Sequence, residues 1–312
     1  MNVRVTDQTQ TNNAVTYMRQ RAADLAIYQD QVSSGLRVKL PSDDPGSFPL
    51  LSQVRSASLR LDAYSQTATD TTNVLDASVS ALQDINDLLV RARQIAQEGA
   101  DSSTGGDSIA RESLATEVDG LIDRALRGVN TRPDGNTIFG GTAINTLPFR
   151  VATTDANGRP ATIAYDGAAE RSRILIGPDQ TVTSRYVGSD VFQRPGADVF
   201  GSLIALRDDL RNTTFTETTR SQALNQRLAE VDSARTAVGE TVGEQAATLV
   251  TLESIQTLTG DAKLLADTRV GELSATDYAE AVVKMQEQQT ALQAIYATTA
   301  KLFETGLLDF IG

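Results

Sequence analysis

The adjacent acidic residues Asp43 and Asp44 are the first candidates for chemistry in this sequence. General acid–base catalysis needs two carboxyl groups that both reach one reacting bond. Neighbouring side chains point apart, and these two are flanked by Pro41 and Pro45, whereas Asp is a preferred residue where a helix begins. We therefore expect Asp43 and Asp44 to be helix-start caps, and we expect no catalytic pair.

Two further groups resemble binding motifs without completing them. Gly140 and Gly141 lack the Lys-Ser or Lys-Thr of a phosphate-binding loop and follow no βαβ pattern, so a turn or close backbone packing accounts for them. Asp155 and Asn157 lack the ladder of oxygens and the final Glu that a calcium loop needs. We expect a turn there and no bound metal.

The composition excludes most other chemistry. The 312 residues include no His, no Cys and no Trp, which excludes His-dependent triads, thiol nucleophiles, zinc sites of Cys or His, and disulfides. A formal charge of −12 repels nucleic acid and anionic lipid. No stretch approaches the roughly 18 apolar residues of a membrane span, and residues 1–13 lack the apolar core of a signal peptide. The sequence predicts neither an enzyme nor a cofactor, nucleic-acid or membrane partner.

Two long segments show apolar residues at alternating spacings of three and four. The first runs from Val54 to Gly99 and would form a rod of roughly 70 Å at 1.5 Å per residue. Ser47 and Pro49 suit the start of this helix. The second runs over 224–273, and its matching length predicts an antiparallel pair of rods. A shorter helix over 108–129 would pack as the third member.

Between the helical halves the sequence changes to short β-prone runs separated by turn residues. Residues 161–165 and 173–176 read as strands, and Asn157-Gly158 is typical of a type I′ turn in a hairpin. We therefore predict a small β-rich module over 138–195, inserted between the helical halves.

Each end of the chain carries one amphipathic helix. Gly35 lies where a helix C-cap would stand, and Asp277 with Glu280 resembles a capping arrangement. A helix with a single apolar stripe is marginal in water unless something covers the stripe. The cover would be the other end of the chain or another copy of the protein.

Together these elements predict a mainly α fold with a β-rich insert. It is an elongated helical bundle of long antiparallel rods, with terminal helices that form a coiled coil between subunits. The chain is predicted to divide into five parts. Residues 1–40 form a terminal assembly helix that is disordered in the monomer, 41–137 the first half of the rod, and 138–195 the β-module. Residues 196–272 form the second half of the rod, and 273–312 a last assembly helix with an apolar tail.

Several motifs, in this order, resemble flagellins and their junction relatives: Gln31-Val32-Ser33-Ser34-Gly35-Leu36-Arg37-Val38, Asn130-Thr131, Ile138–Thr142, Gly188–Phe192, Asp277–Ala281 and Gln288–Ala294. Pro41-Ser42-Asp43-Asp44-Pro45 and the closing residues 307–311 resemble the junction branch, hook-associated protein 3, more than filament flagellin. Leu36 is itself flagellin-like. The resemblance covers both ends and the helix-to-strand junction.

The resemblance implies a structural subunit that joins the flagellar hook, through the first hook-associated protein, to the flagellin filament. It implies a location in the flagellum outside the cell, reached through the flagellar type III channel without a cleaved signal peptide. It also implies self-assembly into a ring or helix, a cytoplasmic export chaperone on the last helix, and no active site or cofactor.

We expect the terminal stripes to build the contacts between subunits. The residues predicted for this interface are Val15, Met18, Ala22, Leu25, Val32, Ser33, Ser34, Gly35, Arg37, Val282, Met285, Leu292, Tyr296, Phe303, Leu307, Leu308 and Phe310. Two alternatives stay open: a flagellin filament subunit and, from another class, a coiled-coil adaptor or signalling protein.

Overall fold

The fold is mainly helical with small antiparallel β-hairpins, as the sequence predicts. The structure, a computed structural model, describes residues 3–101 and 105–311, and within them the side chains of residue 9 and of residues 12 to 300. No helix in these ranges has an apolar stretch long enough to cross a membrane.

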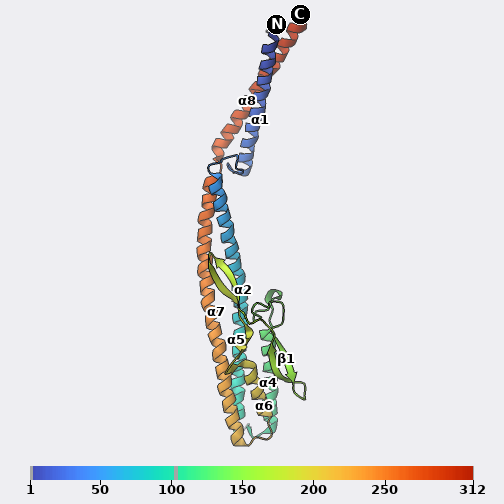
Figure 1. The fold of residues 1–312 in the computed structure, drawn as a ribbon, viewed down its shortest axis with the longest axis vertical. Helices are drawn as coiled ribbons and strands as arrows, with labels where there is room; N and C mark the ends of the chain where they lie inside the picture. The colour runs from blue at the N-terminus through green and yellow to red at the C-terminus, as the bar shows by residue number, and fades with distance from the viewer. Residues whose placement is uncertain (1–2, 102–104, 312) are drawn as a thin grey trace. The chain divides into compact units, whose positions relative to one another are not determined.

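The chain forms two compact units. Unit 1 combines the two ends, Met1–Arg60 and Asp261–Gly312, and unit 2 is the continuous segment Leu61–Gly260. The helices (Figure 1) are α1 (Val3–Ser34), α2 (Phe48–Ala100), α4 (Ser108–Val129), η1 (Pro133–Gly135), α5 (Gly188–Phe192), α6 (Val199–Arg211), α7 (Glu217–Ser274) and α8 (Tyr278–Ile311).

Within unit 2, α2 and α7 run antiparallel. Thr69 of α2 pairs with Gln256 of α7 through their side chains at 3.3 Å, and Arg93 pairs with Asp232 at 3.0 Å. From the first pair to the second, the residue number rises by 24 in α2 and falls by 24 in α7. This is the pattern expected of two antiparallel helices with the same rise per residue. The predicted antiparallel pair of long helices is confirmed.

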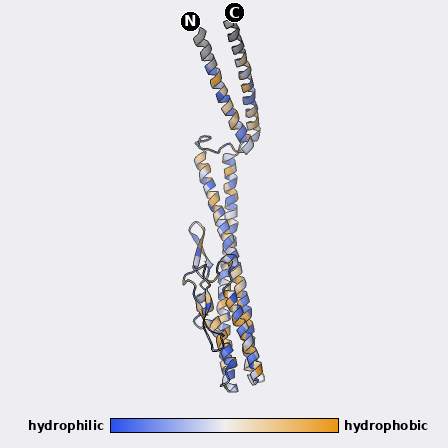
Figure 2. Cartoon of the chain, turned by 90° about the vertical axis from the view of Figure 1, so that its right-hand side faces the viewer, coloured by the Kyte–Doolittle hydropathy of each residue, from blue (hydrophilic) through white to orange (hydrophobic). Residues whose placement is uncertain are grey.

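The third predicted helix, α4, has the predicted bounds, Ser108–Val129. Asp107 accepts a hydrogen bond from the backbone N–H of Ile109 at 2.9 Å and so caps its start. An ion pair between Arg91 and Glu117 at 2.6 Å ties α4 to α2. Figure 2 shows apolar residues, in orange, along the helices of the chain. In unit 2, α4 packs against α6, and the fully buried apolar residues of this core include Leu82, Ile85, Leu89, Leu121, Ile122, Leu203 and Leu206.

The β-module consists of three separate antiparallel pairs. An aromatic cluster joins the first pair to the helices, because the ring of Phe149 lies 5.8 Å from that of Phe192 and 5.5 Å from that of Phe200. The strands are β1 (Phe149–Thr154), β2 (Pro160–Tyr165), β3 (Ser172–Gly177), β4 (Gln180–Arg185), β5 (Gln193–Arg194) and β6 (Ala197–Asp198).

The β1–β2 hairpin is confirmed, but its predicted turn type is wrong. A type I′ turn needs a positive φ at both central residues, and of Asn157 and Gly158 only Gly158 has one, at +79°. The carboxylate of Asp155 instead accepts hydrogen bonds from the backbone N–H groups of Asn157 and Arg159, at 2.8 and 2.9 Å. Asp155 thus organises a longer loop between the strands.

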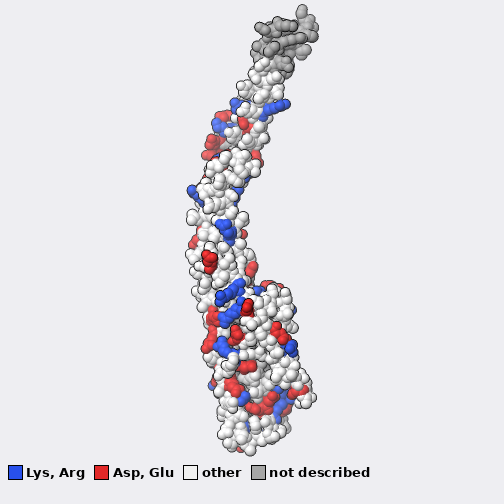
Figure 3. Space-filling model, in the orientation of Figure 1, with Lys and Arg blue, Asp and Glu red and all other residues white. Residues whose placement is uncertain are grey.

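Acidic and basic side chains are interspersed over unit 2 (Figure 3). Arg171 and Glu244, at 2.5 Å, connect the β-module to α7, and Arg211 contacts both Glu112 and Asp119 of α4 at 3.0 and 2.9 Å. The charged residues of unit 2 therefore cross-link its elements, although partly exposed pairs of this kind add little stability each.

Within unit 1, α1 and α8 lie side by side (Figure 1). Arg21 donates to the side-chain carbonyl of Gln288 at 3.0 Å. Gly35 ends α1 with φ +69°, and the carboxylate of Asp277 accepts from the backbone N–H groups of Ala279 and Glu280 at the start of α8. The helix ends predicted at Gly35 and Asp277 are confirmed.

Candidate assembly surface

The two terminal helices face each other along stripes of alternating three- and four-residue spacing. The contact between Arg21 and Gln288 fixes which residues meet. Half-buried side chains on α1 and buried or half-buried ones on α8 follow this spacing, as in a coiled-coil seam. They are Met18, Leu25, Tyr28 and Val32 on α1, and Ala281, Met285, Gln288, Leu292 and Thr299 on α8.

Part of the predicted interface therefore packs inside the chain itself. Met18, Leu25, Val32, Met285 and Leu292 lie on this seam, where the other terminal helix covers them. The sequence left open whether the other end of the chain or another copy of the protein covers the apolar stripe. In the structure, the other end of the same chain covers it.

The outer faces of the same helices remain uncovered. Val15 and Tyr17 on α1 are 38% and 60% exposed, and Val283 and Tyr296 on α8 are 54% and 58% exposed. Ala22 is exposed as well, and Val282 is half-buried. Large apolar side chains on both outer faces of a two-helix unit are typical of a surface that meets another protein.

The remaining predicted residues divide into three groups, of which Gly35 and Arg37 are the last described. Ser33 and Ser34 are exposed, and their hydroxyl groups donate to the backbone carbonyl of Asp30 at 3.0 and 2.6 Å. Four others lie outside the residues whose side chains the structure describes: Phe303, Leu307, Leu308 and Phe310.

Gly35 and Arg37 bind the end of α7. The N–H of Arg37 donates to the carbonyl of Ser274 at 2.7 Å, and the carbonyl of Gly35 accepts from Thr276 at 3.0 Å. The guanidinium of Arg37 also pairs with Asp44 at 3.1 Å. These contacts hold the segment after α1 against the α7–α8 connection, so both residues shape the surface from within.

Asp43 and Asp44 organise the loop before α2. Asp43 accepts from the backbone N–H groups of Lys39 and Leu40 at 2.9 and 2.8 Å, which lowers the pKa of its carboxyl group. Asp44 accepts from the N–H groups of Gly46 and Ser47, and the bond from Ser47 lowers its pKa most. Asp44 thus caps the approach to α2, whereas the expected helix-start role of Asp43 is wrong, because Asp43 closes an earlier turn.

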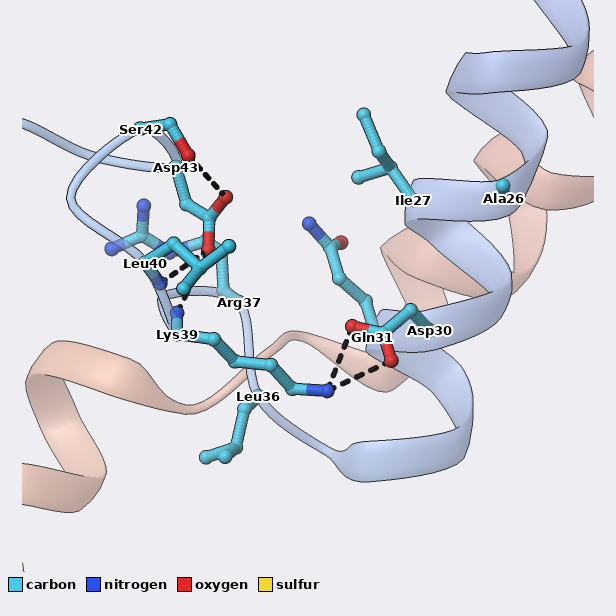
Figure 4. A pocket seen from close by; sticks show the side chains of 10 residues that line it. All are labelled: Ala26, Ile27, Asp30, Gln31, Leu36, Arg37, Lys39, Leu40, Ser42 and Asp43. Carbon is cyan, nitrogen blue, oxygen red and sulfur yellow. Dashed lines mark hydrogen bonds and ion pairs between the residues drawn. The ribbon is translucent and has the colours of Figure 1, made fainter.

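This loop and the last turns of α1 enclose a hollow of about 600 Å³ (Figure 4). The ammonium of Lys39 contacts both carboxylate oxygens of Asp30, at 2.8 and 2.7 Å, and so ties the loop to the helix. Ile27 and Leu40, which are 54% and 60% exposed, are its largest exposed apolar residues. No spacing in the sequence predicts this hollow, although Leu40, an apolar residue beside a polar loop, is a local signal of it.

The geometry supports binding to another protein and offers no chemistry. In the part of the chain that the structure describes, no three His, Cys, Asp or Glu side chains are grouped as a metal site would need. The hollow holds carboxylates already engaged with backbone N–H groups or with Lys39. What unit 1 presents is exposed apolar area on helices and a loop that are joined by hydrogen bonds.

Comparisons with known proteins point to one superfamily. Residues 5–143 match the family model of the bacterial flagellin N-terminal helical region. The chain is 25% identical to flagellar hook-associated protein 3 of Escherichia coli (strain K12), over 88% of this chain and 89% of the relative. It is 22% identical to hook-associated protein 3 of Salmonella typhimurium, over 86% and 87%, and 23% identical to the flagellin of Bacillus subtilis (strain 168), over 66% and 65%.

Solved structures share the fold. FlgL of Xanthomonas campestris superposes with a TM-score of 0.61 at 14% identity, covering 70% of this chain and 99% of that one. FlgL of Bacillus cereus superposes with a TM-score of 0.55 at 18% identity, covering 69% and 96%. At these identities the likeness establishes the helical architecture with its β-insert.

Proposed function

Because this chain belongs to the flagellin superfamily, on the side of hook-associated protein 3, we propose that it is the structural subunit between the flagellar hook and the flagellin filament. One observation carries this assignment: the similarity to two hook-associated protein 3 sequences extends over 86 to 89% of every chain compared. A match of that length includes the β-insert and most of the two long helices α2 and α7. Members of this superfamily are structural proteins without catalytic activity.

The contacts of the subunit come from unit 1. Val15, Tyr17, Val283 and Tyr296 leave both outer faces of the α1–α8 pair apolar, and exposed apolar area of this kind is stabilised by a partner surface. We assign these faces to neighbouring copies of the chain in a ring or helix. The first hook-associated protein would bind on the hook side and flagellin on the filament side.

The proposed junction role also implies a route by which the chain leaves the cell. The chain would reach the end of the hook through the flagellar type III export channel, without a cleaved signal peptide. A cytoplasmic chaperone would cover the apolar stripe of α8 before export, because that stripe has no partner until α1 packs on it.

A filament flagellin is the second candidate, since the Bacillus subtilis flagellin also aligns with the chain. That match covers 66% of the chain, against 88% for hook-associated protein 3 of Escherichia coli. The longer match favours the junction role. The adaptor or signalling alternative has no comparable observation in its favour.

Localisation tests the junction role directly. In a bacterium that lacks the gene, we expect hooks to form while filaments detach or fail to attach, and we expect the wild-type gene to restore motility. Gold-labelled antibody should bind at a single narrow zone between hook and filament. Labelling along the entire filament, or long filaments grown from the purified chain alone, would identify a flagellin and refute the proposal.

Tyr296 offers the cleanest variant for the assembly surface. Its side chain is 58% exposed, so Tyr296→Asp should leave the α1–α8 pair folded and yet prevent incorporation, whereas Tyr296→Phe should incorporate normally. Leu25→Asp is a poorer choice, because Leu25 lies on the seam within the chain and its change would disturb unit 1 itself.

A further inference from the structure

The loop between β1 and β2 carries a dipeptide with covalent chemistry of its own. Asn157 and Gly158 are both exposed, and nowhere else in the 312 residues does Gly follow Asn. An Asn side chain cyclises most readily when Gly follows it, because Gly has no Cβ to obstruct the approach of its nitrogen to the side-chain amide. The pair therefore has the residue types and the exposure that deamidation needs.

This reaction needs water and no other reagent. The backbone nitrogen of Gly158 bonds to Cγ of Asn157 while the bond from Cγ to the side-chain nitrogen breaks. The Gly158 proton leaves with that nitrogen as ammonia, and a succinimide ring remains. Water then opens the ring at one of its two carbonyl carbons, which gives aspartate or isoaspartate at position 157. Either product carries a negative charge where the amide was neutral.

Hydrogen bonds within the loop oppose the first step. The N–H of Gly158 donates to the backbone carbonyl of Asp155 at 3.0 Å, and its proton is the one that the reaction removes. The Asp155 carboxylate accepts from the N–H groups of Asn157 and Arg159 at 2.8 and 2.9 Å. The N–H of Asp155 also donates to the carbonyl of Arg159 at 2.8 Å. The loop must therefore open before the ring can close.

The restraint on this loop persists at neutral pH. The hydrogen bond from the Arg159 backbone lowers the pKa of the Asp155 carboxyl group most, so the carboxylate stays ionised and keeps accepting. The guanidinium of Arg159 also contacts Asp119 and Glu112 of α4, at 3.7 and 3.9 Å. Bonds within the loop and contacts with α4 thus hold the reacting pair in one arrangement.

We propose that Asn157 is a site of slow covalent modification, at which the folded Asp155 loop holds back deamidation. The site goes beyond the proposed function and does not depend on it, so either can fail alone. Because several hydrogen bonds must break together, the folded chain should deamidate at Asn157 at least about tenfold more slowly than the unfolded chain.

Peptide mapping by mass spectrometry measures both rates, since conversion of the amide to an acid raises the mass of the peptide by one unit. The purified full-length chain would be kept in mildly alkaline buffer, either folded or unfolded by guanidinium chloride. We expect modification at Asn157 in both samples, with the folded chain slower by at least about tenfold. Equal rates would overturn the proposal. This comparison needs no variant, so it stands even where a substitution disturbs folding.

Variants then assign the restraint to Asp155. Asp155→Ala removes the acceptor of two hydrogen bonds and should accelerate the reaction in the folded chain at least about fivefold. The matched control, Asp166→Ala, removes the same charge from the same hairpin but only an exposed pair with Arg150, and should change the rate by less than about twofold.

Asn157→Gln identifies the reacting residue. Gln keeps an amide but needs a larger ring, so the mass change should disappear from this peptide. Persistence of the mass change would place the reaction elsewhere and overturn the site. A folded Asp155→Ala chain that reacts no faster than wild type would overturn the role of the loop.

Discussion

Gln245 lies in the seam between α2 and α7 with its polar group unsatisfied. Its side chain is fully buried, and neither the amide nitrogen nor the amide oxygen has a hydrogen-bond partner in the described structure. The pairing of Thr69 with Gln256 places Ser78 opposite the turn that holds Gln245, and the Ser78 hydroxyl is unsatisfied too. Gln245 and Ser78 therefore bring buried polar groups without hydrogen-bond partners into the contact between α2 and α7.

Replacing Gln245 by Met should stabilise unit 2. An unsatisfied buried polar group costs about 1–3 kcal/mol, and Met has a similar length without the amide. The free energy of unfolding should therefore rise by about 1–3 kcal/mol. For a segment of this size, roughly 2–4 °C of melting temperature correspond to each kcal/mol, so the transition of unit 2 should move upward by about 2–12 °C.

Calorimetry and urea unfolding measure the effect, with an increased midpoint and an unchanged m-value expected. Gln256→Met is the control, because Gln256 is partly exposed and bonded to Thr69, and it should change stability by no more than about 0.5 kcal/mol. A loss of 1 kcal/mol or more in the Gln245 variant would refute the reasoning, since it would mean that the amide makes a favourable interaction in solution.

Three further perturbations follow from the structure. Gly188→Ala would bring the new methyl group within 2.6 Å of the Phe149 ring, and should lower the free energy of unfolding by about 1–3 kcal/mol in urea titrations. Arg207→Met removes a guanidinium that is 1% exposed and donates to the Pro160 carbonyl at 2.6 Å, and should cost about 2 kcal/mol in the same assay. Because folding lowers the pKa of the Asp43 carboxyl group, its contribution to the stability of the loop is complete above pH 3.8 and is lost as the pH falls below that value. Hydrogen exchange of the loop amides, normalised to the intrinsic exchange rate at each pH, should therefore accelerate below pH 3.8.

Each of these has a matched comparison. Gly120→Ala lies in α4 with open space around the new methyl group, and should stabilise by up to about 1 kcal/mol. Arg194→Met breaks an exposed pair with Glu240 and should cost less than about 0.5 kcal/mol. Asp43→Asn should remove much of the pH dependence of the loop. Equal effects in a variant and its comparison would contradict the structural argument behind that prediction, which is burial for Gly188 and Arg207 and hydrogen bonding for Asp43.

The long helices were predictable because their signals are local and repeated. Apolar residues at three- and four-residue spacing fixed α2 and α7, and α4 follows a Gly- and Ser-rich break with Asp107 at its cap. The ends at Gly35 and Asp277 depend on single residues with strong positional preferences. Such features survive in almost any tertiary context, so the sequence alone reveals them.

The assembly surface was only partly predictable, because a stripe shows that a face is buried but not by what. Leu25 and Met285 carry the pattern of an interface and pack against each other's helices within one chain. The hollow depends on bonds from Asp43 and Lys39 that no spacing rule encodes. The turn at Gly158 differed from expectation because the Asp155 carboxylate supplied hydrogen bonds that compete with the type I′ geometry.

The bond between Arg21 and Gln288 joins positions 267 residues apart, and this separation sets an order of events during synthesis. At about 5–20 residues per second, a ribosome needs roughly 15–50 s to pass from one partner to the other. The continuous segment 61–260 can fold on its own during that interval, while α1 has emerged and waits. Of the described helices, α1 is made first and gains its intramolecular partner last, so the α1–α8 pair can form only after α8 has been synthesised.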